Sequence, residues 1–383
     1  MQPISKTSPR RRATALALAA AMASSTALAL APSAGFAEPP GGYADLVQKV
    51  APAVVYIEVT EGPKQTSQQD QQQGQVPPDF PFQQFSQRFG FPFPFPDMRQ
   101  MPQGQMHGVG SGFIVDPSGI IVTNNHVVDH ANSVKVKLSD GREFTAKVLG
   151  TDPATDVAVI KVKSDKPLPY VQFGSSAKMR VGDDVMAVGN PFGLGGTVTT
   201  GIISAKARDI GNGNYDNFLQ TDAAINKGNS GGPLFNDNGK VIGMNTAIIS
   251  PSGGSVGIGF AVPSDLVHKI VNDLEHGGKV QRGWLGVQIQ TVTPDVAAAL
   301  GLDKPHGAMV AAVSPDSPAS KAGLHRGDII TSFNGTDIKT MHDLPRAVAM
   351  TAPNSDAKVD VLRAGKPMTF DVSVGTLKAD KKA

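Results

Sequence analysis

A single serine lies among glycines in the stretch DAAINKGNSGGPLF, which spans Asp222 to Phe235. Such a turn can be purely structural, or it can present Ser230 as a nucleophile. A nucleophilic serine needs a base within hydrogen-bond reach and an acid that orients that base. The histidines and carboxylates elsewhere in the chain therefore decide between the two interpretations.

His126 is the best candidate for the base among the eight histidines. It follows an apolar strand in VTNNHVV, where its side chain can be fixed at the edge of a cleft. Together with His130 it has the i, i+4 spacing of a zinc-binding helix, but Val127 stands where a zinc protease carries its glutamate. We therefore expect no metal and no cofactor, and we interpret His130 as a surface residue.

Asp156 is the expected orienting acid. In TDPATDVAVIKV it stands at the mouth of an apolar strand, where a half-buried carboxylate can hold an imidazole in one tautomer. Asp152, in the same stretch, remains the rival. The chain order His126, Asp156, Ser230 is that of chymotrypsin-like proteases, which favours Ser230 as a nucleophile.

The glycines around Ser230 fit the same chemistry. Backbone N–H groups of Gly228 and Ser230 would point at the oxyanion that develops during acyl transfer, and glycine at position 228 permits the necessary backbone turn. Gly231 and Gly232 are expected to keep the face beside the nucleophile clear for an extended substrate. The turn therefore predicts an oxyanion site as well as a nucleophile.

Short strands must position these residues. From Gly108 to Val262 apolar strands alternate with turns at Asp116–Gly119, Asp140–Gly141 and Asn238–Gly239. This pattern predicts an antiparallel barrel or sandwich rather than alternating strand–helix units. The glycine-rich GVGSGF at its start is a weak nucleotide-binding candidate, because a hairpin follows it where a helix is required.

A helix closes this region, and a second domain follows. Ser264 is the expected N-cap of the helix, and Gly277–Gly278 are expected to end it. Residues 281 to 376 mix predicted strands with short helices at Pro294–Leu300 and His342–Met350. This length and pattern suit a small α+β domain.

The N-terminus has the three-part pattern of a secretory signal peptide. Arginines 10–12 precede an apolar run rich in Ala and Leu, and small residues predict cleavage after Ala37. An uncleaved anchor is disfavoured because polar residues at 24–26 interrupt the run, which also lacks bulky side chains. We expect residues 1–37 to be removed from an exported protein whose membrane association is at most peripheral.

Composition argues against nucleic acid as a partner. The chain has 35 Lys and Arg against 33 Asp and Glu, and a net charge of +2 is too small for that role. Residues 63–106 differ from the rest, being rich in Gln, Pro and Phe without a usable period. They fit a flexible loop or a segment that docks on another surface, and the sequence leaves both open.

Several motifs together resemble one protease family. The resemblance rests on TNNHVV, TDVAVIKV, VGNPFGLGGTVTTGIIS, QTDAAINKGNSGGPLFN and GIGFAVPS, and on WLGVQI and GAMVAAVSPDSPASKAGLHRGDIITSFNG. These are similar to the HtrA/Deg family of ATP-independent periplasmic serine proteases and to its PDZ domain. The resemblance implies a mostly β fold. A chymotrypsin-like double β-barrel protease domain would span 38–279, a small α+β PDZ domain 280–377, and a tail 378–383.

The resemblance also implies roles for individual residues. His126, Asp156 and Ser230 take the roles of base, orienting acid and nucleophile. Ile225 and Ile248 resemble residues that shape the primary specificity pocket, so cleavage is expected after small or branched apolar residues.

Regulatory positions can be carried over in the same way. Arg208 matches the sensor-loop arginine that relays peptide occupancy, and residues 63–106 occupy the place of a long regulatory loop. One loop resembles the segment that captures a peptide's terminal carboxylate, namely Trp284, Leu285, Gly286 and Val287.

The implied function is degradation of misfolded or unfolded exported proteins in the periplasm through an acyl-enzyme, with apolar C-terminal peptides as activating partners. The family forms trimers or multiples of trimers. One PDZ domain favours a trimer here, although a chain ending before a second such domain would look the same. The alternative is a peptide-binding chaperone or scaffold with little or no proteolysis, against which the intact set of three residues argues.

Overall fold

The computed structural model describes residues 42–61, 106–191, 196–211, 213, 215–226, 228–250, 254–300 and 302–377. The predicted signal peptide, nearly all of the insertion at 63–106 and the tail at 378–383 lie outside the described residues. No helix within these ranges is long and apolar enough to cross a membrane.

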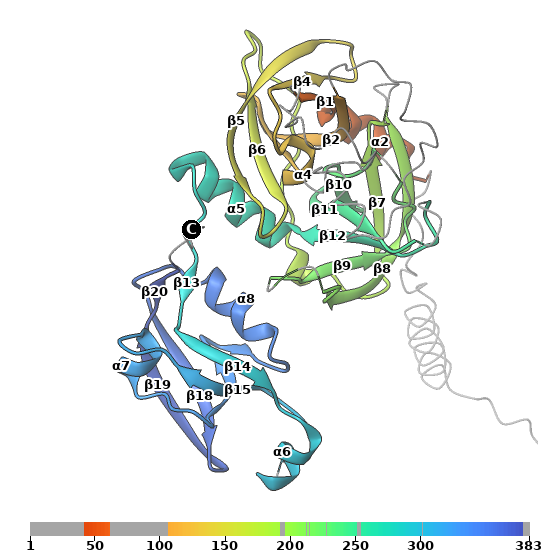
Figure 1. Ribbon diagram of the computed structural model, residues 1–383. Helices are drawn as coiled ribbons and strands as arrows, with labels where there is room; N and C mark the ends of the chain where they lie inside the picture. The colour runs from red at the N-terminus through yellow and green to blue at the C-terminus, as the bar shows by residue number, and fades with distance from the viewer. Residues whose placement is uncertain are drawn as a thin grey trace, which may run out of the picture. The chain divides into compact units, whose positions relative to one another are not determined.

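Six antiparallel strands close into a first barrel (Figure 1). In order around the barrel they are β1 (Val54–Glu61), β2 (Met106–Asp116), β3 (Ile120–Thr123), β6 (Val157–Val162), β5 (Glu143–Asp152) and β4 (Ser133–Lys137). Buried aliphatic side chains from these strands, such as Ile57, Ile121 and Ile160, fill its interior. The predicted turns at Asp116–Gly119 and Asp140–Gly141 are confirmed, because they join β2 to β3 and β4 to β5.

A second closed barrel of six antiparallel strands follows in the chain. Its strands, in order, are β10 (Pro233–Asn236), β11 (Val241–Ile248), β12 (Gly259–Pro263), β9 (Phe218–Thr221), β8 (Thr197–Arg208) and β7 (Asp184–Gly189). Strand β11 is buried along its whole length. The predicted turn at Asn238–Gly239 joins β10 to β11. The two barrels confirm the expected mostly β, chymotrypsin-like double-barrel fold, and GVGSGF lies in strand β2.

Short helices complete the double-barrel region. They are α2 (Ala44–Val50), η1 (Ala51–Ala53), α4 (Asn125–Val128), η4 (Ser176–Lys178) and α5 (Ser264–Gly277). Helix α5 lies against β5 and β6 of the first barrel and β11 and β12 of the second. It buries Val267, Ile270, Val271 and Leu274.

The expected N-cap of α5 is wrong by one residue. Pro263 is the N-cap, and Ser264 is already helical. The Ser264 hydroxyl instead donates to the carbonyl of Gly174 at 2.8 Å and accepts from the backbone N–H of Ser176 at 3.1 Å. The predicted end of the helix is confirmed, since Gly278 is its left-handed C-cap.

The second domain has its own core around a mixed set of strands and helices. Its main sheet has the strand order β14 (Val287–Thr291), β15 (Ala308–Val313), β16 (Ile329–Phe333), β18 (Asp356–Arg363) and β19 (Lys366–Ser373). Strand β17 (Thr336–Asp337) pairs with β16, and β13 (Gly283–Trp284) pairs with β20 (Gly375–Thr376). The helices are α6 (Pro294–Ala299), α7 (Pro318–Ala322) and α8 (Asp343–Met350). Both predicted helices are thus present, within one residue of the expected bounds.

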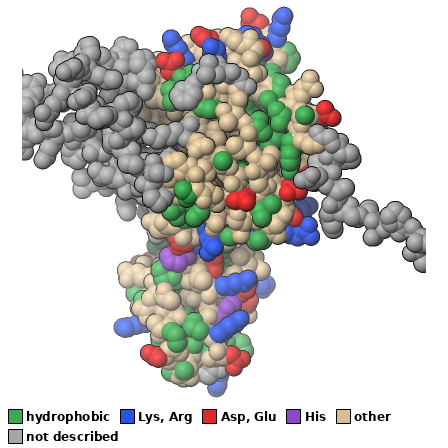
Figure 2. Space-filling view, turned by 90° about the vertical axis from the view of Figure 1, so that its right-hand side faces the viewer, with side chains coloured by type: hydrophobic (Ala, Val, Ile, Leu, Met, Phe, Trp, Pro, Cys, Tyr) green, Lys and Arg blue, Asp and Glu red, His purple; other side chains and the backbone are tan. Residues whose placement is uncertain are grey.

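Charged side chains are mixed on the molecular surface. On the face drawn in Figure 2, Lys and Arg are interspersed with Asp and Glu. This agrees with the small net charge of +2.

An ion pair between buried Asp328 and partly exposed Arg363 fixes the loop after α7 in the second domain. The guanidinium of Arg363 donates to both oxygens of Asp328, at 2.7 and 2.8 Å, and the backbone N–H of His325 donates to the same carboxylate at 2.8 Å. Burial alone raises the pKa of Asp328, but the hydrogen bonds from Arg363 and His325 outweigh it. The pKa therefore lies below its ordinary value of 3.8.

Replacing this carboxylate should destabilise the second domain. Asp328→Asn leaves Arg363 partly buried without a counter-ion, and we expect a loss of about 3 kcal/mol in the free energy of unfolding at pH 7. Because the folded pKa is depressed, this contribution is present above the unfolded pKa and is lost as pH falls below about 4. Fluorescence of Trp284, the one tryptophan in the sequence, reports the transition during urea unfolding.

The control for this measurement is an exposed pair in the same domain. Lys358 and Asp371 lie 3.0 Å apart with side chains 71% and 78% exposed, so Asp371→Asn should cost less than about 1 kcal/mol. The assignment would be contradicted if the two variants lost equal free energy of unfolding. It would also be contradicted if the difference between their losses increased at acidic pH.

Candidate active site

The predicted base and acid lie in direct contact. Strands β3 and β6 are antiparallel neighbours, so the residues just after β3 lie beside those just before β6. His126, on α4, places Nδ1 2.8 Å from Oδ2 of Asp156, and its backbone N–H donates to Oδ1 at 3.0 Å. The Nδ1 side of the imidazole ring therefore faces the carboxylate.

Asp156 has an unusual backbone conformation. Its φ is +57°, in the left-handed region that residues other than glycine rarely adopt. Its carbonyl accepts from the backbone N–H of Asn125 at 3.1 Å and from the side-chain amide of Asn124 at 3.0 Å. These bonds offset a conformational cost of about 1 kcal/mol and aim the carboxylate at His126.

A third residue, Thr246 of β11, also binds the acid. Its hydroxyl donates to Oδ2 of Asp156 at 2.7 Å and accepts from the amide of Asn124 at 3.2 Å. The sequence analysis did not identify Thr246 or Asn124 as partners of Asp156. The available signal was a hydroxyl in the apolar strand VIGMNTAI and two asparagines directly before His126.

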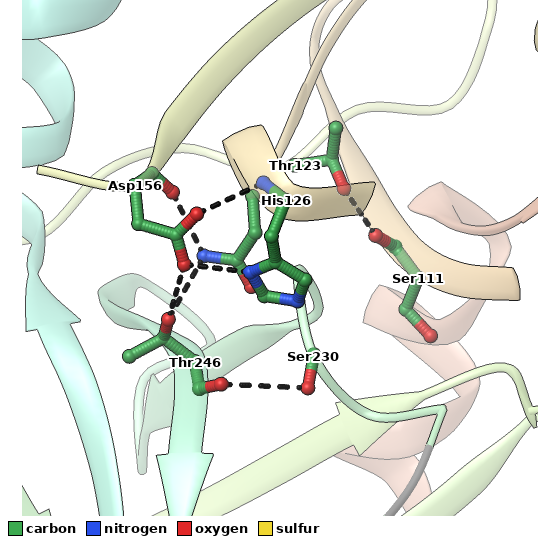
Figure 3. Close-up of polar contacts among 7 residues, drawn as sticks. Ser111, Thr123, His126, Asp156, Ser230 and Thr246 are labelled. Atoms are coloured by element: carbon green, nitrogen blue, oxygen red, sulfur yellow. Dashed lines mark hydrogen bonds and ion pairs between the residues drawn. The ribbon is translucent and has the colours of Figure 1, made fainter. Parts of the chain in front are cut away.

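Ser230 enters the site from the second barrel, in the turn before β10. Figure 3 shows the imidazole ring of His126 between the Asp156 carboxylate and Ser230. The Ser230 hydroxyl lies 3.5 Å from the carbonyl of Thr246, and its own carbonyl accepts from the backbone N–H of Ser111 at 2.9 Å. The structure thus brings all three predicted residues together across the two barrels.

The glycines beside Ser230 are required by close packing. Gly228 has φ +94°, and a Cβ there would lie 2.5 Å from Cβ of Pro191. Gly231 has φ +84°, and a Cβ there would lie 2.2 Å from the carbonyl oxygen of Ser111. A Cβ on Gly232 would meet the carbonyl of Val188 at 2.3 Å. Both glycines therefore have a packing reason, and the expectation that they keep a substrate face clear stays a prediction.

The alternative acid, Asp152, and the second histidine of the motif, His130, have different hydrogen-bond partners and exposure. Asp152, the rival acid, is 4% exposed and accepts from the hydroxyl of Thr155. His130 lies beyond α4 with a side chain 62% exposed, 3.4 Å from the carboxylate of Asp129. Across the described ranges, no group of three or more His, Asp and Glu side chains could hold a metal ion.

Comparisons with known proteins give the family. A trypsin-like peptidase domain is matched over residues 110–244 and a PDZ domain over residues 283–374. A probable periplasmic serine endoprotease, DegP-like, of Brucella suis is 48% identical over 365 residues, covering 90% of this chain and 70% of the relative. The corresponding protein of Chlamydia pneumoniae is 45% identical, with 87% and 68% covered.

Solved structures agree with these relatives. The HtrA-type protease AlgW with a tripeptide has a TM-score of 0.69 and 37% identity, covering 89% of this chain and 99% of that one. A serine endoprotease from Yersinia pestis has a TM-score of 0.56 and 32% identity, covering 89% and 100%. The chain belongs to the HtrA family of DegP-like serine proteases. It is a serine endoprotease with a PDZ domain.

Three further predicted site residues of this HtrA protease belong to the second-barrel region. Ile225 and Ile248 are 2% and 3% exposed and belong to the same core cluster. Arg208 ends β8, and its Nε donates to the side-chain oxygen of Gln220 at 3.0 Å.

In the PDZ domain, the predicted carboxylate loop connects β13 to β14. Trp284 ends β13, Leu285 is buried at 3% exposure, and Val287 begins β14. Gly286 between them accepts from the backbone N–H of Ser314 at 2.9 Å. Strand β14 stands at the end of the main sheet order, so one of its edges is not paired within the described sheet.

Removing the Thr246 hydroxyl should slow this protease. Thr246→Val deletes a hydrogen bond to a carboxylate, and we expect kcat to fall by roughly 30-fold, equivalent to about 2 kcal/mol. Thr246→Ser keeps the hydroxyl and should retain most of the activity. Turnover of a fluorogenic peptide measures both, and a valine variant with full kcat would show that the hydroxyl is dispensable.

Proposed function

We propose that this protease cleaves peptide bonds through an acyl-enzyme on Ser230. The observation that carries the proposal is the hydrogen-bonded series from Thr246 through Asp156 to His126, with the imidazole next to Ser230. In the proposed mechanism, His126 takes the proton of the Ser230 hydroxyl as the hydroxyl attacks the carbonyl carbon. It then gives that proton to the leaving amine, and a water molecule is activated in the same way to release the acyl group.

Asp156 stabilises the imidazolium formed in each half of this reaction. Its hydrogen bond keeps Nδ1 of His126 as the donor. The backbone N–H groups of Gly228 and Ser230 are proposed to bind the oxyanion of the tetrahedral intermediate. The positive φ of Gly228 supports this role, since the turn must aim two amides at one point.

Cleavage is proposed to follow small or branched apolar residues. Ile225 and Ile248 are aliphatic and buried in one core cluster, and no charge from either would attract Lys or Arg. A pocket lined by them favours side chains such as Val or Ala by apolar contact.

The proposed substrates are unfolded or misfolded exported proteins of the periplasm. The relatives are named periplasmic endoproteases, and the residues before Ala37 have the pattern of an export signal.

We assign the protease domain to 38–279 and the PDZ domain to 280–377. Trimers, or multiples of them, are the proposed assembly.

Peptide binding to the PDZ domain is proposed to raise turnover. A peptide can add as a strand to the free edge of β14, with its terminal carboxylate at the loop from Trp284 to Gly286. The AlgW structures hold a decapeptide or a tripeptide, which supports peptide recognition in this family. Arg208 is the proposed relay from the occupied PDZ domain to the active site.

Loss of the nucleophile should abolish cleavage without abolishing binding. Ser230→Ala is expected to lower kcat on reduced casein by at least about 10⁴-fold, because no acyl-enzyme can form. Anisotropy of labelled casein should show binding similar to that of the parent protein. Ser118→Ala, at an exposed turn, is the control and should remain active. A Ser230→Ala protein that still cleaves would refute the mechanism.

The specificity pocket can be tested by enlarging it. Ile225→Ala should raise kcat/KM for peptides with Leu before the scissile bond, relative to Val, by about tenfold. Ile242→Ala removes the same atoms from the same core cluster, and both variants should lose about 3 kcal/mol of stability. Only the Ile225 variant should change the Leu to Val ratio. A ratio that moves equally in both variants would place Ile225 in the core alone.

Peptide activation can be tested with and without a free carboxylate. A peptide with an apolar C-terminus should stimulate casein cleavage, and the same peptide with an amidated end should not. Arg208→Ala should bind the free-acid peptide with unchanged affinity yet lose the stimulation, whereas Arg142→Ala, another exposed arginine, should keep it. Unchanged stimulation of the Arg208 variant would rule out the relay.

A further inference from the structure

Ser111, on β2 of the first barrel, contacts the nucleophile's turn through both its backbone N–H and its hydroxyl. It is fully buried. Its backbone N–H donates to the carbonyl of Ser230 at 2.9 Å, and its hydroxyl donates to the carbonyl of Gly228 at 2.5 Å. The hydroxyl also accepts from the backbone N–H of Asn190 at 2.8 Å. One side chain thus connects two loops of the second barrel to the first.

The backbone of Ser111 is itself held in place. Its carbonyl accepts from the hydroxyl of Thr123 at 2.7 Å, a contact drawn in Figure 3. A Cβ on Gly231 would overlap the same carbonyl at 2.2 Å, so this turn lies tightly against Ser111. The hydroxyl therefore projects from a rigid site onto the turn.

The geometry points to Ser111 as a positioning residue for the oxyanion site. The N–H of Ser230 belongs to the peptide plane between Asn229 and Ser230. Ser111 holds the carbonyls of the planes on either side, those of Gly228 and Ser230. A plane between two fixed planes has little freedom to rotate, so its N–H keeps one direction.

The requirement is for a hydroxyl in particular. It donates to one buried carbonyl and accepts from one buried N–H at the same time, which an alanine cannot do. Removing it leaves the Gly228 carbonyl and the Asn190 N–H without this partner, and the turn can relax to satisfy them elsewhere. The hydrogen bonds among Thr246, Asp156 and His126 do not involve this hydroxyl. Its loss should therefore affect oxyanion binding and leave those contacts in place.

This inference rests on the proposed acyl-enzyme mechanism, and the variant Ser111→Ala tests it. We expect kcat on a fluorogenic peptide to fall by about 10- to 100-fold, below the ~10²–10³ typical of deleting a whole donor, with KM changed less than about threefold. The affinity for a peptide boronic acid, whose tetrahedral adduct occupies the oxyanion site, should fall by the same factor as kcat/KM.

Ser264→Ala is the matched control. Ser264 is also fully buried, and its hydroxyl also bridges a backbone carbonyl and a backbone N–H, but at the start of α5. Both variants should lose similar stability in thermal unfolding, and only Ser111→Ala should lose kcat and boronate affinity. Equal kinetic effects in the two variants, or a Ser111→Ala protein with full kcat, would overturn the inference.

A second variant covers the case in which Ser111→Ala does not fold. Ser111→Cys keeps nearly the same volume with a weaker donor, in a chain that otherwise has no cysteine, and kcat should fall below that of the parent under reducing conditions. A cysteine variant with full kcat would also overturn the inference. Failure of the proposed function itself gives a different result, namely cleavage by the Ser230→Ala protein.

Discussion

The carboxylate of Asp156 is the point on which the active-site arrangement depends. It binds both Nδ1 and the backbone N–H of His126, and Thr246 of the other barrel donates to it. Its backbone is held in the left-handed region by Asn124 and Asn125. Leaving one donor to a partly buried carboxylate unpaired costs on the order of 1 kcal/mol. The two barrels therefore stabilise the site only when they are joined correctly.

The nucleophile depends on the same junction from the other side. Each barrel is built from hairpins that can form locally, but Ser230 lies in a turn whose carbonyls are bound by Ser111 of the first barrel. The tight approach of Gly231 to that residue leaves no room for a side chain. His126, Asp156 and Ser230 are thus brought together when the barrels pack. A substitution at a contact in one barrel is therefore expected to change the position of site residues in the other barrel.

The main sheet of the PDZ domain has one edge, that of β14, that is not paired within the described sheet. Strand β14 ends the main sheet order and offers backbone groups to an added strand. Its core is separate, and the ion pair of Asp328 and Arg363 holds the loop after α7 in place. Such a domain can bind a peptide without changing its own fold.

The sequence alone determined the kind of fold and the main chemical groups. Turn residues between apolar runs predicted the hairpins, and motif order predicted His126, Asp156 and Ser230, because both signals are local in the chain. The sequence could not rank Asp152 below Asp156 by geometry, and it missed Thr246 and Ser111. Those roles depend on contacts between residues about 90 to 120 positions apart, which exist only after the barrels pack. Tertiary structure also decided why Gly231 is a glycine, since only the folded chain brings the carbonyl of Ser111 against it.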